Sequence, residues 1–271
     1  MNHQHYLKQV EEKLQELAAE TDATRKSAEF QQYLDTMARF WKYSYHNQLL
    51  IHFALPSATR VAGFKTWQGL GRRIKKGTKA IHILGPVMRQ EKQDDGSEKE
   101  LIVNFTPVNV FDISQTEGKE LPHLDVTLQG DDQQKLLDAL VHFCEVKKIT
   151  LDFKNLGVNG LYGYSQGGKV VVSSKDSVNT QVNTLVHEIT HELLHHPSDL
   201  TEQQKEIEAE GTAYVVCKHF GLSTKSFTYL AMYKADSKEI MAHLEAIAKA
   251  SREVLNGIDF PFAQKETISF L

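Results

Sequence analysis

The stretch QVNTLVHEITHELLHH, residues 181–196, decides the fold of the second half of the chain. Apolar residues recur there at the three-and-four spacing of a helix that buries one face. We therefore predict one helix with an apolar stripe packed into a core and a polar face beside it. The predicted stripe consists of Val182, Leu185, Val186, Ile189 and Leu193.

Two histidines stand off this stripe, four residues apart. His187 and His191 project from the same helix face, displaced by about 6 Å along the axis, so both can reach one metal ion. Glu188 is turned further round the helix, where it can act on a water at the metal without occupying the metal itself. The HExxH pattern thus predicts a zinc-hydrolase centre with His187 and His191 as ligands and Glu188 as catalytic base. The alternative is an HExxH that arises by accident on a solvated face.

A second predicted helix supplies acidic side chains. A capping box formed by Thr201 and Gln204 starts this helix, which we expect to reach Phe220. Glu206 and Glu210 lie on one face of it. We predict Glu206 as the third metal ligand and Glu210, one turn further, as a hydrogen-bond partner of a ligand histidine. The alternative is that these acids form only a solvated face.

Two further histidines end the first helix. His195 lies eight residues beyond His187, about 12 Å along a straight helix, which is too far for both to bind one ion. We interpret His195 and His196 as helix-end histidines, which the negative end of the helix dipole stabilises.

Positive charge is concentrated in residues 36–90, which contain ten Lys or Arg and no Asp or Glu, although the whole chain has a net charge of −4. Aromatic residues are interleaved with these cations. Cations neutralise phosphates and aromatic faces stack bases, so the pattern predicts a single-stranded-DNA-binding surface. One alternative is that the aromatic residues lie in the core, as we expect for Phe40, Phe53 and Phe64. Another is that the basic stretch binds an acidic protein partner. The candidate DNA-binding residues are Trp41, Tyr43, Tyr45, Arg60, Lys65, Trp67, Arg72, Arg73, Lys75, Lys76 and Lys79.

The order of patterns predicts an α+β protein with two domains. We expect a small α+β domain at residues 1–125, with a linker at about 116–130, and a mainly helical domain with a short β-hairpin at 131–271. Expected helices cover 4–20, 27–43, 45–54, 131–147, 181–196, 201–220, 226–234 and 237–255, and expected strands cover 61–64, 80–89, 99–110, 161–165 and 169–173.

The sequence has neither a secretory signal nor a long apolar span, so we expect a cytoplasmic protein without a membrane partner. Cys144 and Cys217 are far apart and offer no CxxC pair. We expect them to be buried thiols in a reducing compartment.

Residues 44–86, from SYHNQLL to KAIHILGP, resemble the N-terminal single-stranded-DNA-binding domain of ArdC-type antirestriction proteins. The segments GYSQGGKVVVSS, TLVHEITHELLHH and EIEAEGTAYVVC resemble the zinc metallopeptidase domain of the ImmA/IrrE group, which ArdC-type proteins also carry. The resemblance implies a zincin-like fold with His187 and His191 as zinc ligands, Glu188 as catalytic acid/base and an acid in the segment 206–210 completing the site. It also implies carriage on mobile genetic elements.

Together these observations lead to the hypothesis of a single-stranded-DNA-binding zinc metallopeptidase that cleaves an unknown protein or peptide, or protects incoming DNA. The alternative hypothesis is a non-catalytic DNA-binding antirestriction protein with a structural zinc site. Glu188 distinguishes the two, because a structural site has no use for that carboxylate.

Overall fold

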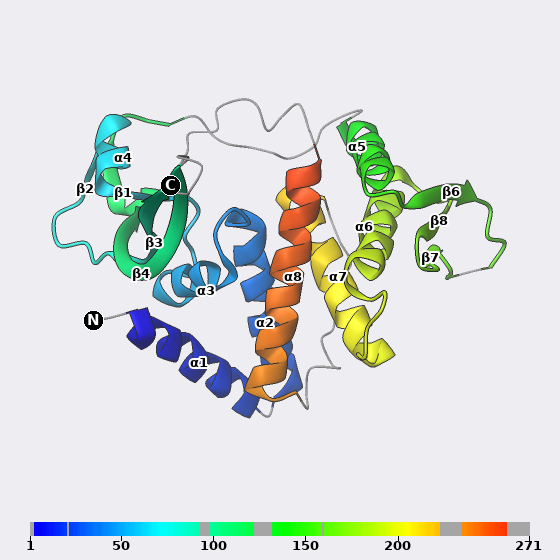
Figure 1. Cartoon of the computed structure of the whole chain (residues 1–271), viewed down its shortest axis with the longest axis horizontal. Coiled ribbons are helices and arrows are strands. Elements are labelled where there is room, and N and C mark those ends of the chain that lie inside the picture. Colours follow the sequence, from blue (N-terminus) through cyan, green and yellow to red (C-terminus); the bar gives the residue numbers. More distant parts are fainter. Residues whose placement is uncertain are drawn as a thin grey trace. The chain divides into compact units, whose positions relative to one another are not determined.

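The computed structural model describes residues 3–20, 22–92, 98–121, 132–158, 160–222 and 235–258. The described chain forms two compact units, one from residues 3–15 and 46–121 and the other from residues 16–45 and 132–258. Both units combine helices with small sheets (Figure 1), which confirms the predicted α+β class.

The first unit contains a three-stranded antiparallel sheet of order β1-β4-β3 and a two-stranded antiparallel sheet of β2 and β5. The long β4 is the central strand, because it pairs with β1 near its end and with β3 along most of its length. The elements are α3 (Tyr45–Ala54), β1 (Val61–Gly63), α4 (Phe64–Gly69), β2 (Arg72–Ile74), β3 (Ile81–Lys92), β4 (Glu98–Asp112), the 3-10 helix η1 (Ile113–Gln115) and β5 (Thr116–Gly118).

A buried carboxylate fixes the end of β4. One oxygen of Asp112 accepts the backbone N–H groups of Thr59 and Arg60, at 2.7 and 2.9 Å, and the other accepts that of Ser114 at 2.9 Å. The segment before β1 and the turn after β4 are therefore tied to one side chain, since buried backbone donors need a partner.

The described part of the second unit combines helices with a three-stranded sheet of order β6-β8-β7, which lies at the edge of the helices (Figure 1). β6 runs parallel and β7 antiparallel to the central β8. Its hydrophobic core draws side chains from α5, β8, α6, α7 and α8. The elements are α2 (Ala23–Arg39), α5 (Asp132–Val146), β6 (Thr150–Lys154), β7 (Gly163–Ser165), β8 (Lys169–Ser173), α6 (Val178–Leu194), α7 (Glu202–His219) and α8 (Ser237–Gly257), and α1 (His3–Ala19) spans the division between the units.

The division of the chain differs from the two predicted domains. Residues 16–45 pack with the second unit, because α2 is bound to α7 and the segment after it to α8. The hydroxyl of Tyr214 donates to Asp35 Oδ1 at 2.6 Å, and Arg252 Nε donates to the carbonyl of Trp41 at 3.0 Å. The predicted linker is also too long, since residues 116–118 form β5.

Most predicted helices and strands are present within a few residues of their expected bounds. The structure also contains the strands β2, β5 and β6, which were not predicted from the sequence. The expected helix at 226–234 lies outside the described residues. No helix in the described part of the chain combines the length and hydropathy that crossing a bilayer requires.

Helix α4 reverses the expected exposure of two aromatic residues. Trp67 is 0% exposed and its indole N–H donates to the carbonyl of Phe111 at 2.8 Å, whereas Phe64 is 56% exposed. The prediction of Trp67 as a surface aromatic was therefore wrong, as was the core position expected for Phe64.

Trp67→Ala is expected to lower the free energy of unfolding by about 3–5 kcal/mol, because it opens a large cavity in the first unit and leaves a buried carbonyl without its donor. Phe64→Ala, on the same helix, is the matched control and should change it by about 0.5 kcal/mol or less. Denaturant unfolding monitored by circular dichroism measures both. Equal losses in the two variants would contradict this assignment.

Candidate metal centre

Helix α6 carries the candidate metal centre. Its first turn is capped by Ser177, whose hydroxyl accepts the backbone N–H of Thr180. Val182, Leu185, Val186 and Ile189 are fully buried in the core of the second unit, and Leu193 packs against that core. The predicted apolar stripe is thus confirmed, and its burial places the face with the two histidines at the edge of the core.

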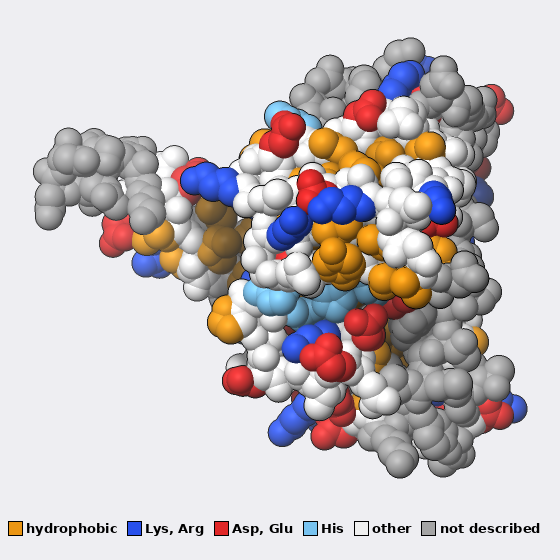
Figure 2. Space-filling model, turned by 90° about the vertical axis from the view of Figure 1, so that its right-hand side faces the viewer, with side chains coloured by type: hydrophobic (Ala, Val, Ile, Leu, Met, Phe, Trp, Pro, Cys, Tyr) orange, Lys and Arg blue, Asp and Glu red, His pale blue; other side chains and the backbone are white. Residues whose placement is uncertain are grey.

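Three side chains converge at this edge. The Nε2 atoms of His187 and His191 lie 3.1 Å apart, and the two carboxylate oxygens of Glu206 on α7 lie 3.4 Å from these nitrogens, one oxygen from each. Figure 2 shows a band of histidine side chains across one face of the molecule, with acidic side chains next to it. One ligand atom from each of the three residues can be chosen so that all lie within 4.8 Å of one another, which is the arrangement that one metal ion needs.

These separations fit a zinc ion. With Zn–N and Zn–O bonds near 2.0–2.2 Å and tetrahedral angles, neighbouring ligand atoms stand about 3.3 Å apart. The observed separations of 3.1 and 3.4 Å agree with this value. The structure therefore brings together the three residues that the sequence predicted as ligands, and their donor set suits a divalent metal.

The electrostatics of the three side chains are coupled. Hydrogen bonds with His187 and His191 hold the pKa of the Glu206 carboxyl far below its ordinary value. Burial alone would lower the pKa of His187, but the hydrogen bond with Glu206 and the negative charges around it raise that pKa above 6.5. Glu206 is thus ionised at neutral pH, which is the form that binds a cation.

Glu188 lies beside the histidines in a more enclosed position. Its side chain is buried, and burial raises the pKa of its carboxyl in spite of the nearby His187 and His191. Strand β7 packs closely here, since a Cβ atom on Gly163 would lie 2.6 Å from Thr184 Cγ2 and 3.4 Å from Glu188 Cγ. A raised pKa suits a group that must take up a proton and release it again near neutral pH.

Glu192, one turn after Glu188, holds the β7–β8 turn. Its two carboxylate oxygens accept the backbone N–H groups of Gly167 and Gly168, at 3.0 and 2.5 Å. Both glycines have positive φ, which side chains strain to adopt. This contact ties the β7–β8 turn to α6, and the two glycines are its only indication in the sequence.

Glu210 lies on the side of His187 that faces away from the other ligands. Its Oε1 atom is 4.0 Å from His187 Nδ1, which is an ion-pair separation rather than a hydrogen bond. The predicted role of Glu210 as a hydrogen-bond partner of a ligand stays a prediction.

His195 is more than a helix-end histidine. It is the C-cap residue of α6, but its Nδ1 atom lies 2.9 Å from His191 Nδ1 and its Nε2 atom 3.1 Å from Glu208 Oε2. Glu208 also contacts His243 of α8 at 2.7 Å. Burial alone would raise the pKa of Glu208, but the hydrogen bonds from the two histidines outweigh it and lower that pKa. Sequence reasoning missed this cluster, although the i,i+4 spacing of His191 and His195 was available.

The candidate DNA-binding aromatics are mostly not exposed. Tyr45 is buried in the second unit, so a base cannot stack on it, and its prediction as a surface residue was wrong together with that of Trp67. Tyr43 is half-buried, and burial raises the pKa of its hydroxyl to about 12. Trp41 packs against the core of the second unit and, edge to face, against His219.

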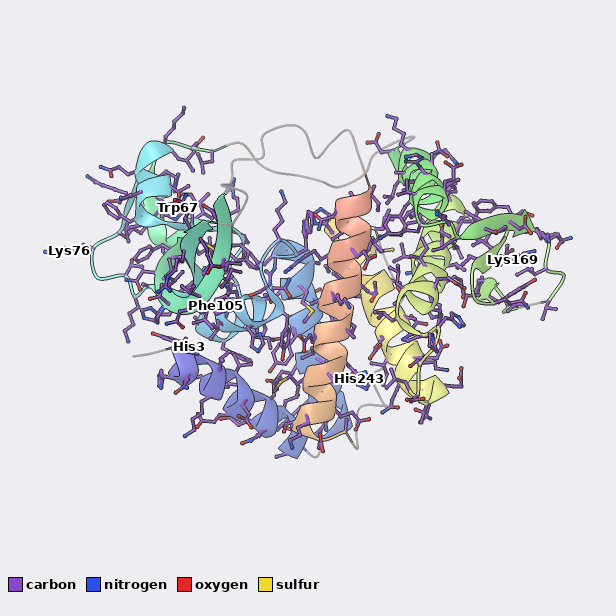
Figure 3. All side chains as sticks on the ribbon, viewed as in Figure 1. His3, Trp67, Lys76, Phe105, Lys169 and His243 are labelled. Carbon is purple, nitrogen blue, oxygen red and sulfur yellow. The ribbon has the colours of Figure 1, made fainter. Side chains whose placement is uncertain are left out.

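The candidate cations differ in how freely they can meet a phosphate. Arg72 donates to Thr116 and to the carbonyl of Lys119, and Arg73 pairs with Glu117 at 2.8 Å. Lys75 donates to the carbonyl of Ser114 at 2.8 Å, and burial lowers the pKa of Arg60. The remaining three candidates, Lys65, Lys76 and Lys79, are exposed, and Figure 3 shows Lys76 pointing outward from the loop after β2.

Residues 2–111 match the family described as the N-terminal domain of anti-restriction factor ArdC. This match covers the N-terminal part of the chain. An uncharacterised protein of Bacillus anthracis is 24% identical to the chain over an alignment that covers 75% of the chain and 43% of that protein. The chain thus corresponds to less than half the length of this relative.

Two crystal structures of the antirestriction ArdC protein from plasmid R388 are also similar. The metal-free structure has a TM-score of 0.48 and 16% identity, covering 80% of this chain and 85% of that one. The Mn(II)-bound structure has a TM-score of 0.47 and 14% identity, covering 84% and 98% respectively. Similarity at this level assigns no residue roles.

His187→Ala, His191→Ala and Glu206→Gln are each expected to lose most of the zinc that the wild-type chain binds, because each removes a direct ligand. Glu202→Gln is the matched control: Glu202 is exposed on the same helix and pairs with Lys205. Metal content after dialysis, measured by inductively coupled plasma mass spectrometry, should show one equivalent in wild type and control. Full zinc occupancy in the double variant His187→Ala/His191→Ala would contradict the proposed metal site.

Zinc affinity should fall as the pH is lowered, because protons compete with the metal for His187, whose pKa is raised. The decline is expected to begin above the ordinary histidine value of 6.5. Competition with a chromophoric chelator across the pH range measures it. An affinity independent of pH between 5 and 8, roughly the range of histidine titration, would contradict histidine ligation.

Proposed function

We propose that the chain is a single-stranded-DNA-binding zinc metallopeptidase of the ArdC antirestriction type. The observation that carries the peptidase part is the triangle of His187, His191 and Glu206 with the buried Glu188 beside it. The family of residues 2–111 supports the antirestriction class.

The number of protein ligands supports a catalytic site over a structural one. Among the described residues, His187, His191 and Glu206 form the cluster whose donor atoms lie close enough to share an ion. Structural zinc sites close the tetrahedron with four protein ligands, whereas catalytic sites keep one position open. The half-exposed side chain of Glu206 agrees with a position open to solvent.

A zinc ion bound there would polarise a substrate carbonyl and lower the pKa of a water molecule. The carboxylate of Glu188 then takes a proton from the attacking water and delivers it to the amine that leaves. The raised pKa of Glu188 eases this proton uptake, and the side chain of Glu188 is buried next to Gly163 of β7. In a purely structural zinc site the buried carboxylate of Glu188 would have no function.

Strand β7 offers an edge for an extended peptide. In the described sheet it is paired on one side, with β8, and it packs directly over Thr184 and Glu188. An extended substrate can add to such an edge by main-chain hydrogen bonds. This supports a peptide as the substrate class.

The peptidase proposal is tested with the full chain, zinc and a mixed peptide library analysed by mass spectrometry. Wild type should cleave and stop when a chelator removes the metal. Glu188→Gln should keep its zinc and lose activity by at least about 100-fold, because a general base contributes that much. Cleavage by Glu188→Gln at the wild-type rate would contradict the catalytic role of Glu188. A zinc-bound wild type that cleaves no peptide would favour the alternative of a structural zinc site.

The DNA-binding part rests on residues of the first unit. Phe64 is exposed at the start of α4, next to the exposed Lys65, and Phe105 is exposed on β4. Lys76 and Lys79 add exposed positive charge in the loop between β2 and β3. These residues replace Trp67 and Tyr45 as the side chains available to bases and phosphates.

Single-stranded DNA should bind the full chain with an affinity that falls steeply with salt, because phosphate contacts release counterions. Phe64→Ala should weaken binding by about 1–3 kcal/mol with little change in salt slope. Lys76→Ala should flatten the slope by about one unit. Fluorescence anisotropy at several salt concentrations separates the two effects.

Matched controls come from the second unit. Phe153→Ala, on the exposed face of β6, and Lys175→Ala should leave both affinity and salt slope unchanged. The full chain is used because residues 16–45 pack with the second unit and would lose their partners in an N-terminal fragment. Binding without salt dependence, or equal binding to duplex, would contradict the proposal and favour an acidic protein as partner.

A further inference from the structure

Three buried side chains connect the candidate ligand His191 to helix α8. His195 Nδ1 lies 2.9 Å from His191 Nδ1, His195 Nε2 lies 3.1 Å from Glu208 Oε2, and His243 Nδ1 lies 2.7 Å from Glu208 Oε1. The side chains of His195, Glu208 and His243 are 1%, 6% and 2% exposed. Figure 3 labels His243 on α8. The proposed hydrolysis uses none of the three.

This cluster does not have the geometry of a second metal site. The two histidines approach different oxygens of the Glu208 carboxylate, so their nitrogens do not face one common point. Among the described residues, the cluster with donor atoms near enough to share an ion is the one at His187. The contacts of Glu208 are instead two hydrogen bonds that one carboxylate accepts.

Metal binding at His191 would determine where every proton in the cluster lies. His191 Nε2 faces His187 and Glu206, so it must supply its lone pair to the metal and its Nδ1 must carry the hydrogen. That hydrogen is donated to His195 Nδ1. His195 must then carry its own hydrogen on Nε2 and donate it to Glu208, and His243 donates from Nδ1 to the other oxygen. Each of the three hydrogen bonds in the cluster then has one donor and one acceptor, while His243 Nε2 is buried without a hydrogen-bond partner in the described structure.

We propose that His195, Glu208 and His243 form a positioning chain that holds His191 in the tautomer and orientation required for metal binding. This inference rests on the proposed function, because it needs a metal at His191. A hydrogen bond to the far nitrogen of a ligand histidine fixes the ring and increases its basicity. Here the imidazole of His195 lies between His191 and the buried carboxylate of Glu208, so the negative charge of Glu208 increases the basicity of His191 through His195.

Packing alone does not explain the cluster. Apolar residues would join α6, α7 and α8 without the desolvation cost of a buried carboxylate. The polar cluster also has a direction, since it begins at α8 and ends on the Nδ1 atom of a metal ligand. Helix packing alone does not require a hydrogen bond to the Nδ1 atom of His191.

The test compares Glu208→Gln with Glu202→Gln on the same helix. Glutamine keeps the shape of the side chain, but its amide group is a donor, so it cannot accept from both His195 and His243. We expect Glu208→Gln to lower zinc affinity about 10- to 100-fold. Glu202→Gln, whose side chain is 83% exposed, should bind zinc as wild type does. Competition with a chromophoric chelator measures the affinities.

A spectroscopic measurement separates positioning from stability. At saturating Co²⁺, the visible absorption bands of Glu208→Gln should differ from those of wild type and Glu202→Gln, because the donor strength of His191 has changed. Thermal unfolding of the chelator-treated variants shows whether the fold is intact. A folded Glu208→Gln with wild-type zinc affinity and an unchanged cobalt spectrum would overturn the positioning chain.

A measurement on the wild-type chain covers the case in which Glu208→Gln does not fold. In zinc-loaded protein with ¹⁵N-labelled histidines, NMR should detect a scalar coupling between His191 Nδ1 and His195 Nδ1 through the hydrogen bond. Absence of this coupling would overturn the inference. If wild type binds no zinc at all, the proposed function fails and the positioning chain fails with it, whereas zinc binding without the coupling overturns the positioning chain alone.

Discussion

Helix α6 keeps one face in the core and presents the candidate metal ligands His187 and His191 on the adjoining face, and the rest of the second unit depends on this separation. Burial of Val182, Leu185 and Ile189 fixes the rotation of the helix about its axis. The two histidines are thereby held at the boundary between core and solvent. There the imidazoles are restrained by packing, while their nitrogens stay accessible to an ion.

Close packing of α7 completes the arrangement. Ala209 and Ala213 are fully buried, and a Cβ atom on Gly211 would meet Ile247 of α8 at 2.5 Å. Small residues at these positions let the helices approach closely. The flanking acids are consequently directed two ways, Glu206 to the ligand pair and Glu208 to the buried histidines. One helix thus supplies both a candidate metal ligand, Glu206, and the carboxylate of Glu208, which contacts His195 next to the candidate ligand His191.

The sequence predicted features that depend on local periodicity and failed where remote contacts decide. The α6 stripe, the α7 capping box and the ligand spacing each follow from residues within a few turns. The strand β5 pairs with residues more than 40 positions away, so its short segment read as linker. Trp67 and Phe64 were assigned to surface and core respectively, and the structure reverses both assignments. The indole N–H of Trp67 reaches the carbonyl of Phe111, 44 residues away, a contact that no local pattern indicates.

The contacts of Glu208 with His195 and His243 were not predicted from the sequence for a different reason. We expected that His195 would not bind the same ion as His187, because it lies too far along the helix. His195 instead contacts His191, which the four-residue spacing allows. The third member, His243, lies 35 residues from Glu208 and becomes its neighbour only through the packing of α8 on α7. No pattern in the sequence indicates that contact.

The assignment of residues 16–45 to the second unit affects the order in which the chain is made and folded. The hydrogen bond between Asp35 and Tyr214 joins residues 179 positions apart, and the segment 46–121 of the first unit is synthesised between them. During synthesis, α2 leaves the ribosome long before its partner helix α7 exists, although Phe30, Leu34 and Met37 of α2 are buried in the finished protein. Nascent chains with exposed apolar surface are prone to aggregate and depend on chaperones. Folding on the ribosome is therefore expected to begin in the inner segment 46–121, and α2 is expected to gain its final contacts only after α7 has been synthesised.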